Sequence, residues 1–84
     1  MSRIPNHLPV VKVNTVFFMK IHINGEEQKI VDGLSIAALL DELKIRPDRV
    51  VVELNRTIIS RDALESTPLK EGDVLEIVHF VGGG

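Results

Sequence analysis

The chain has 84 residues, of which 44% are hydrophobic and 26% charged, with a formal net charge of −2 at pH 7 and no cysteine. This length holds one domain with a single modest core, and the composition is typical of a cytoplasmic globular protein rather than a disordered or nucleic-acid-binding one. The lack of cysteine excludes disulfides, zinc–thiolate sites, iron–sulfur ligation by thiolates and a cysteine nucleophile. No apolar run approaches the length of a membrane span, and the N-terminus lacks the continuous apolar stretch of a signal peptide.

Residues 1–18 are expected to form an N-terminal extension, and residues 19–81 the folded domain. Pro5 and Pro9 disfavour regular structure near the start of the chain. The alternative is that alternating apolar residues within 11–17 prolong the first strand of the domain backwards.

The first half of the domain predicts a hairpin. Residues 19–24 alternate apolar and polar side chains, which is typical of a half-buried strand. Asn24-Gly25 is a strong tight-turn dipeptide, so residues 26–31 are expected to return as the second arm.

A helix is predicted next. Ser35 stands where an N-cap is required, because its hydroxyl can accept a hydrogen bond from a free helix N–H. An apolar stripe at helical spacing follows, formed by Ile36, Leu39, Leu40 and Leu43. Pro47 disfavours helical geometry in the residue before it, so the helix should end near Lys44 or Ile45.

The second half predicts three further strands. The β-branched run at residues 50–54 indicates a strand, and residues 57–59 a short one. Residues 62–65 are expected to form a single helical turn, and residues 74–81 a long final strand. One helix against a mixed sheet of four or five strands, an α+β fold, would bury these apolar faces.

The final strand separates two faces by alternation. Leu75 and Ile77 share the parity expected to face the core. Glu76 marks the opposite parity as the open side, because an unpaired carboxylate is rarely buried. Val78 and Phe80 then lie on the open face and are predicted to form an apolar docking patch. The alternative is that a neighbouring strand or the N-terminal segment covers them.

The sequence ends in Val81 and three glycines, Gly82, Gly83 and Gly84. Glycine lacks Cβ, so such a tail can pass through a narrow slot, and at about 3.3–3.6 Å per residue it reaches roughly 10 Å beyond the fold. The tail is therefore expected to present the carboxylate of Gly84 inside another enzyme, with Val81 joining the docking patch at its base. The alternative is an ordinary frayed terminus.

The sequence offers few other candidate metal-binding or catalytic residues. The three imidazoles do not fall at a close metal-ligand spacing; they are His7, His22 and His79. Asp41 and Glu42 are adjacent on the predicted helix and point in different directions, so they are not expected to form a catalytic pair. We predict no catalytic residue, no metal site and no cofactor of the chain's own.

Several segments match one family pattern in register. They are MKIHING at residues 19–25, the two leucines at 39–40, VELN at 52–55, ISR at 59–61, GDVLEIV at 72–78 and the closing glycines. On these residues, the stretch 19–84 resembles the ThiS family of sulfur-carrier proteins, which serve thiamine thiazole synthesis. Ser60 stands where the family often has proline, and residues 1–18 have no counterpart in the family pattern.

The resemblance implies a ubiquitin-like β-grasp fold and a protein cosubstrate rather than an enzyme. An ATP-dependent, ThiF-like enzyme would adenylate Gly84, and a sulfur donor protein would convert the terminus to a thiocarboxylate. A ThiG-like thiazole synthase would then take up the sulfur. The free carrier would be a cytoplasmic monomer without nucleic-acid or membrane partners. Two alternatives stay open: a related carrier for molybdopterin, cysteine or a secondary metabolite, and a β-grasp binding module that is never activated.

Overall fold

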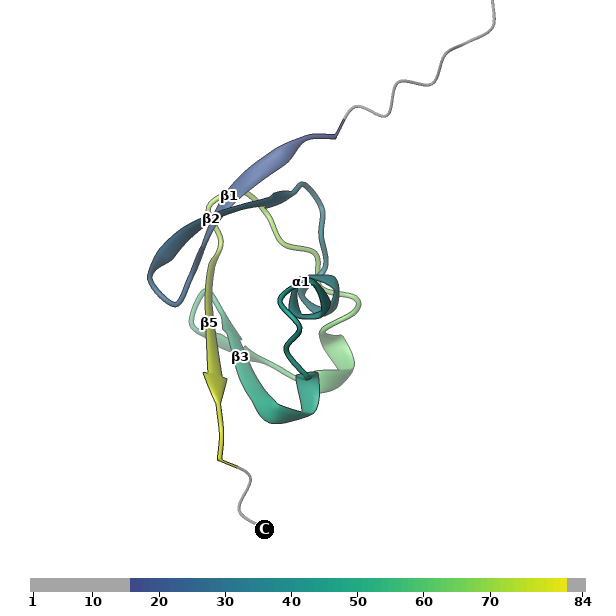
Figure 1. Cartoon of the computed structure of the whole chain (residues 1–84), viewed down its shortest axis with the longest axis vertical. Coiled ribbons are helices and arrows are strands. Elements are labelled where there is room, and N and C mark those ends of the chain that lie inside the picture. The colour runs from purple at the N-terminus through teal and green to yellow at the C-terminus, as the bar shows by residue number, and fades with distance from the viewer. Residues whose placement is uncertain (1–15, 82–84) are drawn as a thin grey trace, which may run out of the picture.

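A single helix packs on one face of a five-stranded mixed sheet in the computed structural model, which describes residues 16–81 (Figure 1). The strands are β1 (Phe18–Ile23), β2 (Glu26–Val31), β3 (Val50–Leu54), β4 (Thr57–Ile59) and β5 (Val74–His79). The helix is α1 (Ile36–Glu42), and two short 3₁₀ turns, η1 (Pro47–Arg49) and η2 (Arg61–Ala63), join the elements. The strand order is β2-β1-β5-β3-β4, with β5 in the centre, parallel to β1 and antiparallel to β3. The predicted fold class and all five strands are confirmed.

The β1–β2 hairpin closes at the predicted dipeptide. Asn24 and Gly25 both have positive φ, 50° and 84°. Asparagine and glycine enter this left-handed region at low cost, and a two-residue turn of this kind matches the twist of the flanking strands.

The first strand begins slightly earlier than predicted. β1 starts at Phe18, which pairs with Val31, and the carbonyl of Phe17 accepts a hydrogen bond of 2.8 Å from the amide of Asp32. Two residues assigned to the extension therefore contact the sheet. Residues 1–15 lie outside the described part of the chain, so the remainder of the predicted extension stays a prediction.

Helix α1 begins as predicted and ends earlier. The Ser35 hydroxyl accepts a hydrogen bond of 3.1 Å from the amide of Ala38, which confirms the N-cap. The helix stops at Glu42 because Leu43 is already the C-cap and Lys44 turns into the left-handed region, with φ of 59°. Leu43 is consequently 43% exposed, so its predicted place in the apolar stripe is wrong.

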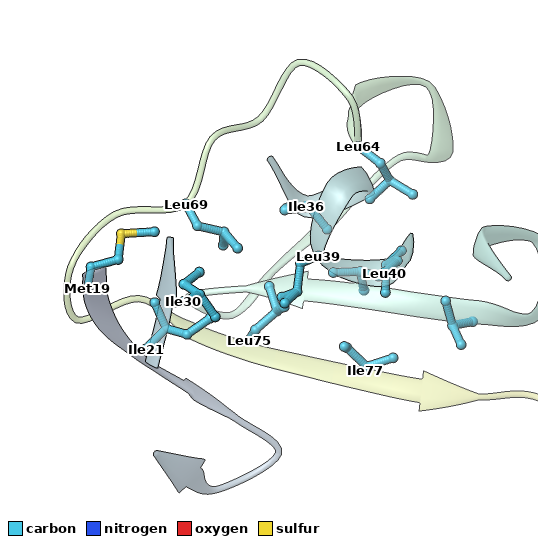
Figure 2. Close-up of a cluster of buried hydrophobic side chains, with 12 residues drawn as sticks. Met19, Ile21, Ile30, Ile36, Leu39, Leu40, Leu64, Leu69, Leu75 and Ile77 are labelled. Carbon is cyan, nitrogen blue, oxygen red and sulfur yellow. The ribbon is translucent and has the colours of Figure 1, made fainter. Parts of the chain in front are cut away.

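The hydrophobic core lies between α1 and the covered face of the sheet (Figure 2). Its buried side chains come from the helix, from four of the strands and from the loop before β5. They are Met19, Ile21, Ile30, Ile36, Leu39, Leu40, Val50, Val52, Leu64, Leu69, Leu75 and Ile77. A single helix can cover only one face of the sheet, so the other face stays open to solvent.

The final strand is shorter than predicted. β5 ends at His79 rather than at Val81, although the amide of Phe80 still donates a hydrogen bond of 3.2 Å to the carbonyl of Arg49. The pairing of β5 with β3 stops here because β3 begins at Val50, and the residues before it form the 3₁₀ turn η1 instead of a strand. Within residues 16–81, no helix is long and apolar enough to cross a membrane.

Candidate partner-binding site

The two predicted faces of β5 are confirmed. Leu75 and Ile77 point into the core, where they are fully or almost fully buried. Val78 and Phe80 lie on the other face and are 55% and 45% exposed. Because the described strands leave both side chains open to solvent, the alternative that a neighbouring strand covers them is wrong. The other alternative, that the N-terminal segment covers them, falls largely on residues 1–15, which lie outside the described residues.

The exposed apolar side chains of β5 continue onto the neighbouring strand. Val78 lies directly opposite Val51 of β3, which is also exposed. Residues directly opposite each other in an antiparallel pair have Cβ atoms about 4.5–5.5 Å apart, so these two side chains are neighbours on the open face. Together with Phe80 they form an apolar patch at the end of the strand, which we call the exit patch. It is the part of the open face next to the tail.

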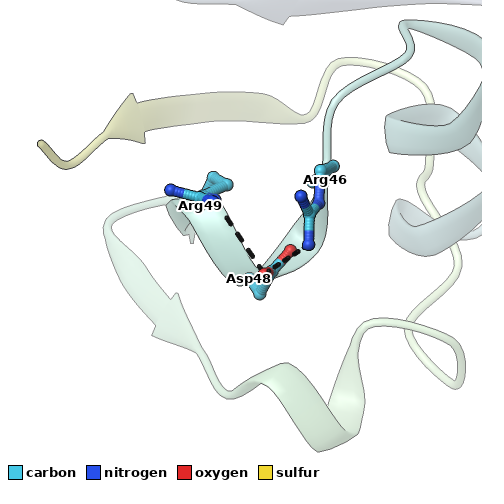
Figure 3. Close-up of polar contacts among 3 residues, drawn as sticks. All are labelled: Arg46, Asp48 and Arg49. Carbon is cyan, nitrogen blue, oxygen red and sulfur yellow. Dashed lines mark hydrogen bonds and ion pairs between the residues drawn. The ribbon is translucent and has the colours of Figure 1, made fainter. Parts of the chain in front are cut away.

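A charged turn, η1, precedes β3 next to the exit patch. Asp48 of η1 lies between Arg46, the residue before this turn, and Arg49, its last residue (Figure 3), with its Oδ2 3.0 Å from Nη2 of Arg46 and 4.0 Å from Nε of Arg49. These side chains are largely exposed, so the ion pairs contribute little to stability. The amide of Phe80 donates a hydrogen bond of 3.2 Å to the carbonyl of Arg49, so the backbone of η1 adjoins the end of the exit patch.

Two carboxylates face each other on the same open surface. Glu53 of β3 lies directly opposite Glu76 of β5, and Ile58 of β4 lies opposite Glu53 on the other side. Like charges directly opposite in a sheet are destabilising. The prediction that Glu76 marks the solvent-facing parity is confirmed.

An asparagine on the hairpin turn completes the other side of β5. The Asn24 amide donates to the carbonyl of Ile77 at 3.1 Å, and its side-chain oxygen accepts from the amide of Ile77 at 2.7 Å. The backbone N–H of Asn24 donates to Leu75 at 2.9 Å. The Asn24 side chain thus makes the two hydrogen bonds to Ile77 that the backbone of a further β1 residue would make, at a point where the chain has already turned into the hairpin. Sequence reasoning identified Asn24 only as a turn residue, because bonds across 53 positions leave no local signal.

The predicted site residues fall into two groups. Val78, Phe80 and Val81 all lie at the end of β5 or just beyond it, and Val81 is 96% exposed. Gly82, Gly83 and Gly84 lie outside the described residues. The structure therefore defines the base of the tail, and the role of the glycines stays a prediction.

Across residues 16–81, no three His, Cys, Asp or Glu side chains are grouped so that they could hold a metal ion. His22 and His79 are both exposed, whereas His7 lies outside the described residues. A shallow pocket beside α1 is lined by Ser35, Ala37, Ala38, Asp41 and Glu65. Its serine is already engaged as the helix cap.

Comparison with known proteins connects this arrangement to one family. The family model described as "ThiS family" matches residues 21–84. The sulfur carrier protein ThiS of Bacillus subtilis is 38% identical over 65 residues, which cover 76% of this chain and 98% of that protein. A thiazole synthase of Magnetococcus marinus is 42% identical over 66 residues, which cover 79% of this chain. The chain spans only 20% of the length of that thiazole synthase.

The solved structures agree with the sequence comparison. The crystal structure of the thiamine biosynthesis protein ThiS from Geobacter metallireducens superposes with a TM-score of 0.70 at 35% identity. The match covers 79% of this chain and all of that one. The ubiquitin-like β-grasp fold implied by the resemblance is therefore confirmed, and the chain belongs to the ThiS family.

Proposed function

We propose that this chain is a sulfur carrier of thiamine biosynthesis and that it acts as a protein cosubstrate rather than as an enzyme. The observation that carries the proposal is the extent of the family match, which runs from β1 through the closing glycines. The match to the Bacillus subtilis sulfur carrier covers nearly the whole of that protein, so no separate catalytic domain is needed to account for it.

The reacting group in this proposal is the α-carboxylate of Gly84. A carboxylate is a poor acyl donor, so a ThiF-like enzyme would first transfer AMP from ATP to it and release pyrophosphate. The persulfide of a sulfur donor protein would attack the acyl carbon and displace AMP. A second thiol would then cleave the S–S bond of the acyl persulfide and leave a thiocarboxylate on Gly84. The chain supplies the acyl group and the recognition surface, and its partners supply ATP and catalytic groups.

A thiazole synthase is the proposed sulfur acceptor. Two relatives named thiazole synthase, from Magnetococcus marinus and Paramagnetospirillum magneticum, match this chain over 66 residues, or 20% of their own length. Each of these two proteins therefore contains a segment similar to this chain within a much longer polypeptide that is named thiazole synthase. We propose that the present chain delivers its sulfur to a ThiG-like thiazole synthase, which binds it as a partner protein.

The exit patch is the proposed docking surface for these enzymes. Val78 and Phe80 are exposed next to the point where the tail leaves the sheet, and Val81 follows them. An enzyme that holds a carboxylate three residues beyond Val81 must lie within roughly 10 Å of this patch. Apolar side chains at such a place can anchor a partner when they become desolvated.

Intact mass spectrometry tests the proposal. The mass of the purified chain first establishes that Gly84 is its last residue and carries a free carboxylate. Incubation with ATP, a ThiF-like enzyme and a sulfur donor should then add the mass difference between sulfur and oxygen. The modified chain should support thiazole formation by a thiazole synthase. An unchanged mass would contradict the carrier role, whereas a thiocarboxylate that the thiazole synthase does not consume would assign the carrier to another pathway.

A further inference from the structure

The backbone of β5 presents its hydrogen-bonding groups alternately to two sides. On the β3 side, the amide of Phe80 donates to Arg49 and the carbonyl of Val74 accepts from Asn55. The backbone N–H and C=O groups of the residues that alternate with these must therefore face β1. This is observed at Leu75, whose carbonyl accepts from the amide of Asn24.

The β1 side of β5 runs out of partners before the strand ends. β1 finishes at Ile23, and the side chain of Asn24 satisfies both backbone groups of Ile77. The next residue on this side is His79, whose N–H and C=O face the space beyond the hairpin turn. Within residues 16–81, the Asn24–Ile77 pair is the last hydrogen-bonded position along this edge. Figure 1 shows β5 continuing towards the C-terminus past the β1–β2 turn.

The other two edges of the sheet are protected, which sets this edge apart. The outer edge strand β2 carries charged side chains at Glu26, Glu27 and Lys29. The opposite edge strand, β4, is only three residues long. Charged or very short edge strands discourage pairing with other chains. The open β1 side of β5 at His79 is protected in neither of these ways. Exposed apolar side chains lie next to it, at Val78 and Phe80.

We propose that an extended segment of the thiazole synthase adds to this edge as a short strand and hydrogen-bonds the backbone of His79 and Val81. This inference rests on the proposed function, which brings that enzyme to the tail. The occupant follows from the length of the chain beyond the fold, because the three residues after Val81 reach only roughly 10 Å. Under the proposed function, the enzyme that receives sulfur from Gly84 must therefore come within roughly this distance of Val81, which lies two residues beyond the open position at His79. Strand addition would use main-chain bonds for affinity and the exit patch for side-chain contacts.

Amide hydrogen exchange of the full chain, with and without the thiazole synthase of the same organism, tests the proposal residue by residue. In the free chain, the His79 amide should exchange rapidly and the Val78 amide, which faces β3, slowly. Binding of the enzyme should slow exchange at His79 and leave Val78 nearly unchanged. Rapid exchange at His79 in the complex would overturn strand addition.

A pair of substitutions separates the backbone from the side chain. His79→Pro removes the N–H that faces the open edge, while the ladder to β3 does not use this group. Its affinity for the thiazole synthase should fall about tenfold, as expected for one lost hydrogen bond. His79→Ala keeps the N–H and should bind like the unaltered chain. Equal affinities for the two variants, each checked by its thermal melting curve, would overturn the proposal.

The outcomes distinguish strand addition from the carrier function itself. If the unaltered chain acquires and delivers sulfur while His79 stays unprotected, strand addition is wrong and the proposed function stands. If the chain forms a thiocarboxylate but does not bind the thiazole synthase, strand addition and the proposed acceptor both fail. If no thiocarboxylate forms, the mass measurement has already contradicted the carrier function independently of the edge.

Discussion

Asn24 is expected to be the polar side chain on which the sheet depends most. Its amide makes two hydrogen bonds to the backbone of Ile77, at 2.7 and 3.1 Å, in a partly buried position. A typical intramolecular hydrogen bond contributes about 0.5–1.5 kcal/mol, so Asn24→Gly should lower the free energy of unfolding by about 1–3 kcal/mol. Glycine is the informative replacement because Asn24 has a φ of 50°, which glycine adopts without strain.

Urea titration of matched variants measures this contribution. Asn24→Ala should cost about 1–2 kcal/mol more than Asn24→Gly, because alanine adds the strain of a left-handed backbone. Asn55→Gly is the control: Asn55 has nearly the same φ, 49°, but its amide bonds to Asp73 and Val74 are exposed. Water can replace exposed bonds, so this control should lose less stability than Asn24→Gly. An Asn24→Gly variant as stable as the unaltered chain, or a larger loss at Asn55, would refute the reasoning.

Three further predictions concern the two ends of the chain and the faces of β5. A chain that begins at Val16 should melt like the full chain, as followed by circular dichroism, and a large loss of stability would show that residues 1–15 belong to the core. Deletion of Gly84, a C-terminal tag or Gly83→Val should each abolish adenylation without changing the melting temperature; full sulfur acceptance by a tagged chain would contradict the carrier mechanism. Phe80→Asp should weaken binding to the adenylating enzyme by about 2 kcal/mol, roughly thirtyfold, in a titration. Ile77→Ala should instead cost about 2–5 kcal/mol of folding stability, and a reversal of the two effects would mean that the exit patch is structural.

Local sequence signals were sufficient for most of the fold. The alternation at residues 19–24, the turn at Asn24-Gly25 and the cap at Ser35 depend on residues only one to four positions apart, and each was correctly predicted. Leu43 shows the limit of periodicity. It has the right spacing for the apolar stripe, but the left-handed turn at Lys44 ends the helix and leaves Leu43 exposed.

The features that shape the site depend on contacts between distant parts of the chain. The outward orientation of Val78 follows from alternation and was predicted, whereas its place directly opposite Val51 in the exit patch is determined by the register of β5 against β3. The bonds of Asn24 to Ile77 likewise require the parallel pairing of β1 with β5. No short window of sequence contains this pairing, so the open edge at His79 became visible only with the complete sheet.

The position of β5 in the sheet fixes where the chain leaves the folded domain. β5 is the central strand, held by β1 and Asn24 on one side and by β3 on the other. Support ends at Ile77 on the β1 side and continues to Phe80 on the β3 side, through the bond to Arg49. The last hydrogen-bonded backbone position in the described part of the chain therefore lies only four residues before Gly84. Under the proposed function, the core thus sets the place from which the carboxylate of Gly84 would be presented. In the proposed complex, a partner strand that hydrogen-bonds His79, which has no backbone partner on this side within residues 16–81, would extend this support by one more position along β5, towards Gly84.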